Sequence, residues 1–150
     1  MKKIFLLTLI TGALLATACH SSRKNTTAED DQASAKVITD KKWKLTELRG
    51  QPVADKINGR EPFIQLQKSD SRYFGTAGCN GIGGAFTLPG NNRIHFSRGM
   101  STMMACENMD IEHGLIDVLQ MADNYTINGK TLSLNKARMA PLARFEEVTP

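Results

Sequence analysis

From residue 43 to residue 148, short runs of alternating apolar and polar side chains are separated by turns rich in glycine, proline and asparagine. Asn128-Gly129 is the strongest turn, because Asn-Gly favours the tight geometry that joins two antiparallel strands. Gly90-Asn91-Asn92 is a second turn, since both residue types tolerate a positive φ. Alternation with period two is typical of strands that bury one face. About eight short strands are predicted, at residues 43–49, 62–67, 73–78, 82–89, 93–97, 125–127, 131–134 and 140–148.

One segment has the spacing of a helix instead. Apolar residues after Glu107 recur every three or four positions, which is typical of an amphipathic α-helix. Asn108 is the predicted N-cap, and Asp110 and Glu112 would interact favourably with the helix dipole. The predicted class is α+β and mainly β, with antiparallel strands in a barrel-like (lipocalin-like) sheet and the helix covering one face or one end. The apolar helical positions are Ile111, Leu115, Val118, Leu119 and Ala122.

The chain begins with the features of an export signal. The basic Met1-Lys2-Lys3 precedes an apolar stretch over residues 4–15, which ends in Ala16-Thr17-Ala18-Cys19. This pattern predicts a lipoprotein signal peptide over residues 1–18, cleaved before Cys19, whose sulfur would carry the lipid that holds the protein on a membrane. The alternative is an ordinary signal peptidase site followed by an incidental cysteine.

Residues 19–42 are predicted to be a polar tether, because almost no large apolar residue interrupts them and such a segment cannot offset its ordering entropy. The folded domain is then predicted over residues 43–150. His20 follows the cysteine where an Asp retains enterobacterial lipoproteins at the inner membrane, so the outer membrane is the expected location. Loss of Lys2 and Lys3 lowers the formal net charge from +4 to +2. Export and the lack of basic clusters argue against a nucleic-acid partner.

Two cysteines, Cys79 and Cys106, are left if Cys19 carries lipid. An oxidising envelope favours a disulfide between them; two reduced, buried cysteines that pack as small apolar side chains are the alternative. Glycine and asparagine around Cys79, in Gly78-Cys79-Asn80-Gly81, suit a tight bend or bulge beside a strand. A nucleophilic role for Cys79 is a lesser alternative.

The order of motifs resembles one family over nearly the whole predicted domain. Gly78-Cys79-Asn80 is followed by Gly83-Gly84-x-Phe86, then by Thr102-Met103-Met104-Ala105-Cys106, and the chain closes with Gly129-x-x-Leu132-x-Leu134. These motifs resemble the META domain family, which includes HslJ-like heat-shock lipoproteins of bacterial envelopes. The resemblance implies a barrel-like antiparallel sheet with one helix, no established enzymatic activity, and a link to stress and antibiotic tolerance. Motif positions, without catalytic roles, are Asn80, Thr102, Met103, Met104 and Glu112.

The methionines and acidic residues are assigned structural roles. Methionine fills irregular cores, so core packing is predicted for six methionines: Met100, Met103, Met104, Met109, Met121 and Met139. Soft sulfur and imidazole ligands also suit Cu(I), and the alternative is a copper site formed by Met100, Met103, Met104, Cys106 and His113.

The acidic residues of the helix predict a solvated surface, although Glu112 could instead satisfy backbone groups near the helix start. These acidic residues are Glu107, Asp110, Glu112 and Asp117.

No motif of a hydrolase, zinc protease or phosphate-binding loop occurs in the chain. No catalytic residue and no cofactor are therefore predicted. The expected function is that of a non-enzymatic lipoprotein of the cell envelope, on the periplasmic or surface face of the outer membrane. It would bind an unknown envelope protein or small ligand in stress or antibiotic tolerance. The alternatives are a periplasmic Cu(I)-binding protein and a carrier for a small apolar ligand inside the barrel.

Overall fold

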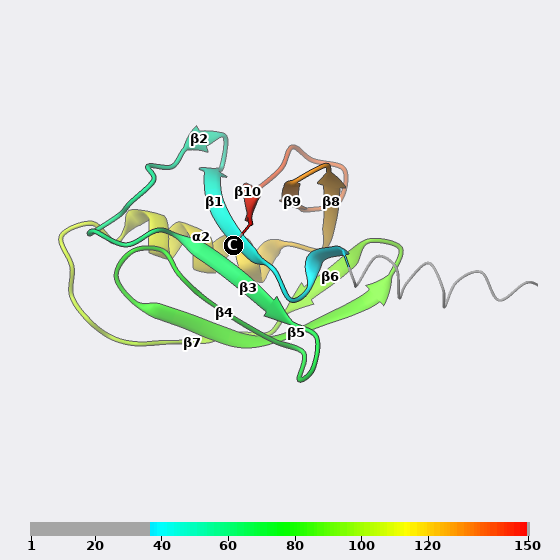
Figure 1. The fold of residues 1–150 in the computed structure, drawn as a ribbon, viewed down its shortest axis with the longest axis horizontal. Helices are drawn as coiled ribbons and strands as arrows, with labels where there is room; N and C mark the ends of the chain where they lie inside the picture. Colours follow the sequence, from blue (N-terminus) through cyan, green and yellow to red (C-terminus); the bar gives the residue numbers. More distant parts are fainter. Residues whose placement is uncertain (1–36, 150) are drawn as a thin grey trace, which may run out of the picture.

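An antiparallel sheet and a twelve-residue helix dominate residues 37–149, the part of the chain that the computed structural model describes (Figure 1). Ten strands contribute to the sheet. The helix follows the seventh strand and leads directly into the last three. In chain order the elements are β1 (Lys42–Leu48), β2 (Gln51–Pro52), β3 (Phe63–Gln67), β4 (Arg72–Thr76), β5 (Gly81–Gly90), β6 (Arg93–Phe96), β7 (Met100–Ser101), α2 (Asp110–Met121), β8 (Asn124–Asn128), β9 (Thr131–Asn135) and β10 (Ala143–Val148).

The strands form a closed ring of hydrogen bonds. β1 pairs with β3 on one side and with β10 on the other, so the path β1–β3–β4–β5–β6–β8–β9–β10 returns to β1. The short strands β2 and β7 lie outside this ring, paired with β1 and β5 respectively. The prediction of a mainly β fold, with about eight antiparallel strands in a barrel-like sheet and one helix, is confirmed.

The interior of the ring is filled by side chains. Alternate residues of several strands are buried, as Ile64 and Leu66 are in β3 and Ile94 and Phe96 are in β6. An eight-stranded ring is just wide enough for side chains to fill it, and the interior is therefore a packed core. Its largest fully buried side chains include Trp43, Leu45, Ile64, Leu66, Ile94, Leu132, Leu134 and Phe145, joined by Leu115, Val118 and Leu119 of α2.

Helix α2 begins later than the sequence predicts. Its N-cap is Met109, which makes no side-chain capping bond, and not Asn108. Asn108 still contributes, because its Oδ1 accepts a hydrogen bond of 3.3 Å from the backbone N–H of Asp110. Within the helix, a Cβ at Gly114 would lie 2.8 Å from Leu48 Cδ2. The glycine therefore lets α2 approach β1 closely, at the expense of helix propensity.

The fold begins before residue 43, where the sequence places the end of a tether. Ile38 is fully buried, and its carbonyl oxygen accepts a hydrogen bond of 2.8 Å from Trp43 Nε1. Residues 37–42 therefore belong to the domain, whereas the predicted signal peptide, Cys19 and the rest of the tether lie outside the described residues. Over residues 37–149, no helix has the length and apolar character needed to cross a membrane.

Candidate functional site

Three methionines stand on the surface between β5 and α2. The exposed fraction of the side chain is 76% for Met100, 98% for Met103 and 47% for Met104. Core packing, which the sequence predicted for them, is wrong, and it is wrong for Met139 as well, which is 66% exposed. Only the two residues of β7 pair with β5, after which the chain leaves the sheet and has no inward face. We call Met100, Met103 and Met104 the methionine surface.

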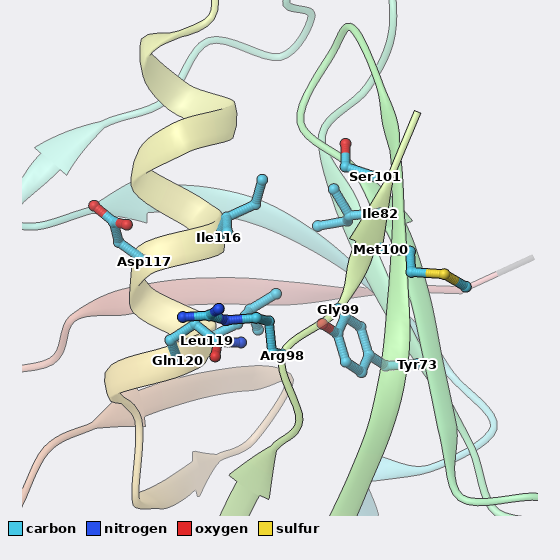
Figure 2. A pocket seen from close by; sticks show the side chains of 10 residues that line it. All are labelled: Tyr73, Ile82, Arg98, Gly99, Met100, Ser101, Ile116, Asp117, Leu119 and Gln120. Carbon is cyan, nitrogen blue, oxygen red and sulfur yellow. The ribbon is translucent and has the colours of Figure 1, made fainter. Parts of the chain in front are cut away.

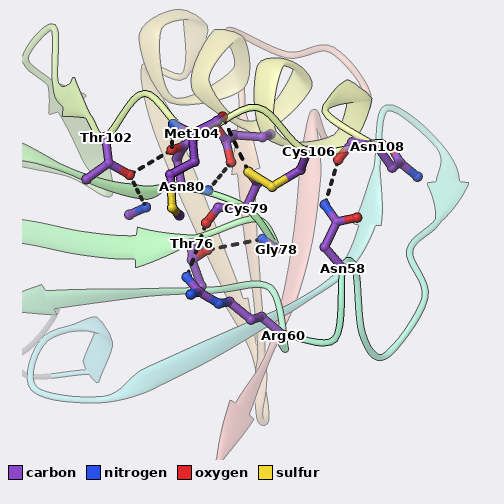
Figure 3. Close-up of a disulfide and its surroundings, with 12 residues drawn as sticks. Asn58, Arg60, Thr76, Gly78, Cys79, Asn80, Thr102, Met104, Cys106 and Asn108 are labelled. Atoms are coloured by element: carbon purple, nitrogen blue, oxygen red, sulfur yellow. Dashed lines mark hydrogen bonds between the residues drawn. A yellow bond between two sulfur atoms is a disulfide. The ribbon is translucent and has the colours of Figure 1, made fainter.

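Asn80 fixes the chain segment that carries the methionine surface (Figure 3). Its Oδ1 accepts hydrogen bonds from Thr102 Oγ1 at 2.7 Å and from the backbone N–H of Met104 at 2.8 Å. Its Nδ2 donates to the carbonyl oxygen of Met104 at 3.1 Å and to Glu112 Oε1 at 2.8 Å. Thr102 Oγ1 in turn accepts from the backbone N–H of Gly81 at 3.2 Å. One buried side chain thus ties the β4–β5 connection to residues 102–104 and to the helix.

Glu112 is buried, although the sequence favoured a solvated carboxylate. Only 2% of the residue is exposed, and its Oε2 accepts a hydrogen bond of 2.6 Å from the backbone N–H of Asn80. With the bond from Asn80 Nδ2, both carboxylate oxygens are occupied. Glu112 is also the third residue of α2, where the helix dipole favours a negative charge. The carboxylate has a positioning role and is not open to solvent for acid–base chemistry.

A disulfide links Cys79 and Cys106 across this network. The two sulfur atoms are 2.00 Å apart, and the Cα atoms 6.1 Å. Cys79, next to Asn80, is buried. The bond therefore holds the end of the segment that begins at β7 to the same turn that Asn80 holds from its middle. A bonded Cys79 has no thiol for nucleophilic chemistry, and a bonded Cys106 has no thiolate for a metal.

A third segment, between β2 and β3, completes the junction. Arg60 Nη1 donates to the carbonyl oxygen of Cys79 at 3.1 Å, and Asn58 Nδ2 donates to that of Asn108 at 2.9 Å. Gly78 has a φ of +113°, and a Cβ there would lie 2.5 Å from Ile57 Cβ. A glycine is thus required for close packing at this turn. Residues 57–60, 78–81 and 102–108 meet beside the start of α2, and we call this meeting point the junction.

Two hollows lie along α2 on this side of the molecule. The first has a volume of about 450 Å³, and its lining includes Met103, Met104, Met109 and His113. The second has a volume of about 340 Å³ and lies between α2 and the chain around β7 (Figure 2). Burial raises the pKa of the Tyr73 hydroxyl in its wall above the usual value, so Tyr73 is a neutral donor at physiological pH. Ser101 and Ile116 line both hollows.

The five residues predicted for the copper alternative do not all line one hollow. Met100 lines the second hollow, whereas Met103, Met104, Cys106 and His113 line the first. Cys106 is occupied by the disulfide. Among the residues that the structure describes, no group of three histidine, cysteine, aspartate or glutamate side chains could hold a metal ion.

Several residues of the site were not identified from the sequence. Asn58 and Arg60 act through side-chain bonds to distant carbonyl oxygens, which no local pattern indicates. Arg98 and Tyr73 line the same hollow because β7 returns beside β5. The glycine and asparagine of the 78–81 turn were the one usable signal, and they correctly placed a tight bend next to β5.

The fold and the junction define a class of small β proteins with a helix docked against a closed ring of strands. Comparison with known families identifies the class: the META domain model matches residues 36–149, and the chain belongs to this family. No curated protein matches the chain.

Solved structures share the fold at low sequence identity. One, determined by NMR for a protein from Burkholderia xenovorans, is 18% identical, with a TM-score of 0.63 over 79% of this chain and 88% of that one. Another, a crystal structure of a DUF4847 family protein from Bacteroides vulgatus, is 14% identical, with a TM-score of 0.54 over 75% of this chain and 94% of that one. At such identities the likeness shows the fold alone.

Proposed function

We propose that this protein is a non-enzymatic lipoprotein of the bacterial cell envelope whose META domain binds a partner protein through the methionine surface. Lipid on Cys19 would hold it at the outer membrane, and the polar residues that follow would let the domain stand away from the lipid. The role in the cell would be tolerance of stress or antibiotics, as the family resemblance implies. Nucleic acid is not among the partners we propose.

The exposure of the methionine surface is the observation that carries this proposal. Met103 is 98% exposed and Met100 is 76% exposed, although exposing large apolar side chains to water has a free-energy cost. Methionine is common on surfaces that bind varied partners, because its flexible thioether adapts to the surface it meets. The disulfide and Asn80 hold the segment in place. Binding of a partner would therefore cost little conformational entropy, because the backbone of this segment is already ordered.

The test compares survival and crosslinking in one set of strains. A strain without the protein is complemented with the wild type, with the triple variant M100Q/M103Q/M104Q, or with Met139→Gln as the matched control. Met139 is also exposed, at 66%, but it lies in the connection between β9 and β10. We expect the triple variant to fail under heat and antibiotic stress, while Met139→Gln restores survival.

A photo-reactive residue at position 103 then identifies the partner directly. We expect one discrete adduct from position 103 and none from position 139, with the adduct lost when Met100 and Met104 are changed to glutamine. Survival that is equal for the triple variant and the wild type, together with no adduct, would overturn the docking role.

The lipid anchor requires a separate measurement. Mass spectrometry of the N-terminal peptide of the mature protein should show acylated Cys19, and membrane fractionation should place the protein with the outer membrane. An unmodified Cys19, or a mature chain that begins elsewhere, would instead support the ordinary signal peptidase site. The control is Cys19→Ser, which should yield unacylated protein whose domain unfolds at the same urea concentration.

Copper binding is the second candidate function, because Met103, Met104 and His113 line the same hollow. Thioether and imidazole ligands suit Cu(I), although Cys106 offers no thiolate while it is bonded. Titration with Cu(I) in ascorbate, read by NMR, should show stoichiometric shifts at these residues if a site exists. An absence of stoichiometric binding removes this function and leaves the docking role intact.

A further inference from the structure

The hollow between α2 and β7 has an apolar floor and a volume of about 340 Å³ (Figure 2). Ile82 of β5 and Ile116 and Leu119 of α2 form the floor. Binding sites for small molecules commonly have volumes from about 300 Å³ upward, with apolar walls and a few polar groups that fix orientation. This hollow therefore has the size and the lining of a small-molecule site.

Two polar groups reach into the hollow without a partner of their own. Within residues 37–149, Arg98 has neither an ion pair nor a hydrogen bond, and Figure 2 shows its guanidinium beside Leu119 and Gln120. The Tyr73 hydroxyl also has no hydrogen bond. Every fully buried side-chain nitrogen or oxygen of the described residues does have one. The hydroxyl is therefore accessible from the hollow that Tyr73 lines.

The other polar groups around the hollow are already engaged. Asp117 Oδ2 lies 3.1 Å from Arg49 Nη2 in an exposed ion pair. Gln120 Nε2 donates to the carbonyl oxygen of Ser97 at 3.0 Å. Gly99 lies close to the Tyr73 hydroxyl and has no room for a side chain, since a Cβ there would lie 2.3 Å from the hydroxyl oxygen. The free groups that remain are one cation and one neutral donor.

We propose that this hollow binds a small monocarboxylate with an apolar chain, its carboxylate held by Arg98 and the Tyr73 hydroxyl and its chain packed on Ile82, Ile116 and Leu119. The planar guanidinium matches a carboxylate in geometry and charge. The phenolic O–H donates to the second oxygen of the carboxylate. The engaged carboxylate of Asp117 nearby disfavours a ligand with two negative charges. This site shares Met100 with the methionine surface, but it depends on Arg98 and Tyr73, which the proposed partner docking does not use.

Octanoate is the probe, and 1-octanol is the control that keeps the chain but lacks the charge. Inorganic phosphate is the control that keeps a charge but lacks the chain. Each is titrated into the intact folded domain and followed by two-dimensional NMR. The variants are Arg98→Gln, Tyr73→Phe and the matched control Arg138→Gln. Arg138 is an exposed arginine outside the hollow, and Tyr73→Phe retains the ring that stacks edge-on against Phe96, with centroids 5.2 Å apart.

We expect octanoate to produce saturable shifts at residues 98–101 and on the facing side of α2. Arg98→Gln should weaken binding about tenfold or more, because it removes a hydrogen bond between charged groups. Tyr73→Phe should weaken binding about threefold to tenfold, and Arg138→Gln should leave it unchanged. Octanol and phosphate should each bind at least about tenfold more weakly than octanoate.

Three results would overturn the proposal. The first is no saturable shift from octanoate up to about 10 mM, roughly ten times the 1 mM dissociation constant of a weak ligand. The second is equal affinity of the Arg98→Gln and Arg138→Gln variants. The third is octanoate shifts confined to Met103 and Met104, which would place the ligand on the methionine surface. The Arg98→Gln and Tyr73→Phe variants leave all three methionines in place, and a double variant M103Q/M104Q leaves the lining of this hollow in place. Failure of one proposal is therefore distinguishable from failure of the other.

Discussion

The Asn80 side chain makes all four hydrogen bonds that an asparagine amide can form, two as donor and two as acceptor. Its partners come from the chain after β7 and from α2, which are 22 to 32 residues away in the sequence. Such a network is sensitive to any change at one member, because the groups left behind are buried and lose their partners. The role of Asn80 is therefore to hold the junction together.

Glu112 is the member of this network that can be tested most cleanly. In Glu112→Gln, one carboxylate oxygen becomes an NH₂ group that faces a donor of Asn80, either its backbone N–H or its Nδ2. We expect the free energy of unfolding to fall by about 2 kcal/mol. Urea unfolding at neutral pH measures it, with Glu107→Gln, an exposed glutamate just before the helix, as the control. Equal unfolding midpoints for the two variants would contradict this role for Glu112.

The sequence identified Asn80 and Glu112 as positions of the family motif, but it did not show what they do. The spacing of Glu112, Leu115 and Leu119 places all three on one face of α2, and all three are buried. From the sequence alone, a glutamate on that face is predicted to be solvated unless its hydrogen-bond partner is known. That partner is 32 residues away, and no local pattern reports a contact over such a separation.

At the scale of elements, the segment between β7 and α2 depends on attachments to its neighbours. Of residues 100–106, only Met100 and Ser101 pair with β5. The rest is held by Asn80 and by the disulfide between Cys79 and Cys106. Alternation predicted the other strands well, since one face of each packs on the core. Alternation could not predict the conformation of residues 102–106, because this segment is held by bonds to side chains and not by pairing with a strand.

The disulfide should contribute a large part of the stability of the domain. It closes a loop over a sequence separation of 27 residues, which corresponds to about 3–4 kcal/mol of chain entropy in the unfolded state. Urea unfolding with and without dithiothreitol should show this loss in the wild type. The double variant Cys79→Ala/Cys106→Ala is the control and should not respond to dithiothreitol. A wild type that is equally stable in both conditions would contradict the contribution.

The pairing of β3 with β4 depends on a glycine. A Cβ at Gly75 would lie 2.2 Å from the carbonyl oxygen of Phe63, which belongs to the neighbouring backbone and cannot rotate away. Gly75→Ala should therefore lower the free energy of unfolding by about 2–3 kcal/mol. Gly81→Ala on the next strand is the matched control, because nothing lies within 4 Å of its Cβ position. The urea midpoints of the two variants should differ clearly, and equal midpoints would show that the β3–β4 pair can separate at little cost.

At the scale of the whole molecule, the ring closes where the first and last strands meet. β1 and β10 pair from Lys42 with Val148 to Leu48 with Ala143, and this contact joins the two ends of the domain. On the opposite side of the ring the strand pairing is less extensive, since β6 and β8 share the single pair of Arg93 and Asn124. The sequence predicted strands that pair with their neighbours in order. It also predicted a barrel-like sheet, which requires such a closure, but no local pattern indicated the register in which β1 and β10 meet.

The residues before β1 cover this closure. Asp40 donates its backbone N–H to the carbonyl oxygen of Leu66 at 2.7 Å, and its Oδ1 accepts from the backbone N–H of Lys68 at 3.0 Å. Lys41 Nζ lies 2.9 Å from Glu147 Oε2, beside the last pairs of β1 and β10. The segment is therefore bound to both neighbours of β1. The sequence analysis assigned this segment to the polar tether because only Val37 and Ile38 in it are large and apolar.

Ile38 tests whether this segment belongs to the cooperative fold. Its side chain is fully buried, so Ile38→Ala should leave a cavity and lower the free energy of unfolding by about 3 kcal/mol. Val37→Ala is the matched control one residue earlier, because Val37 is 40% exposed and little is lost on its truncation. Urea unfolding followed by fluorescence of Trp43, whose Nε1 donates to the Ile38 carbonyl oxygen, reports directly on this contact. If both variants unfold at the wild-type urea concentration, the domain folds without residues 37–41, and the segment serves only as the end of the tether.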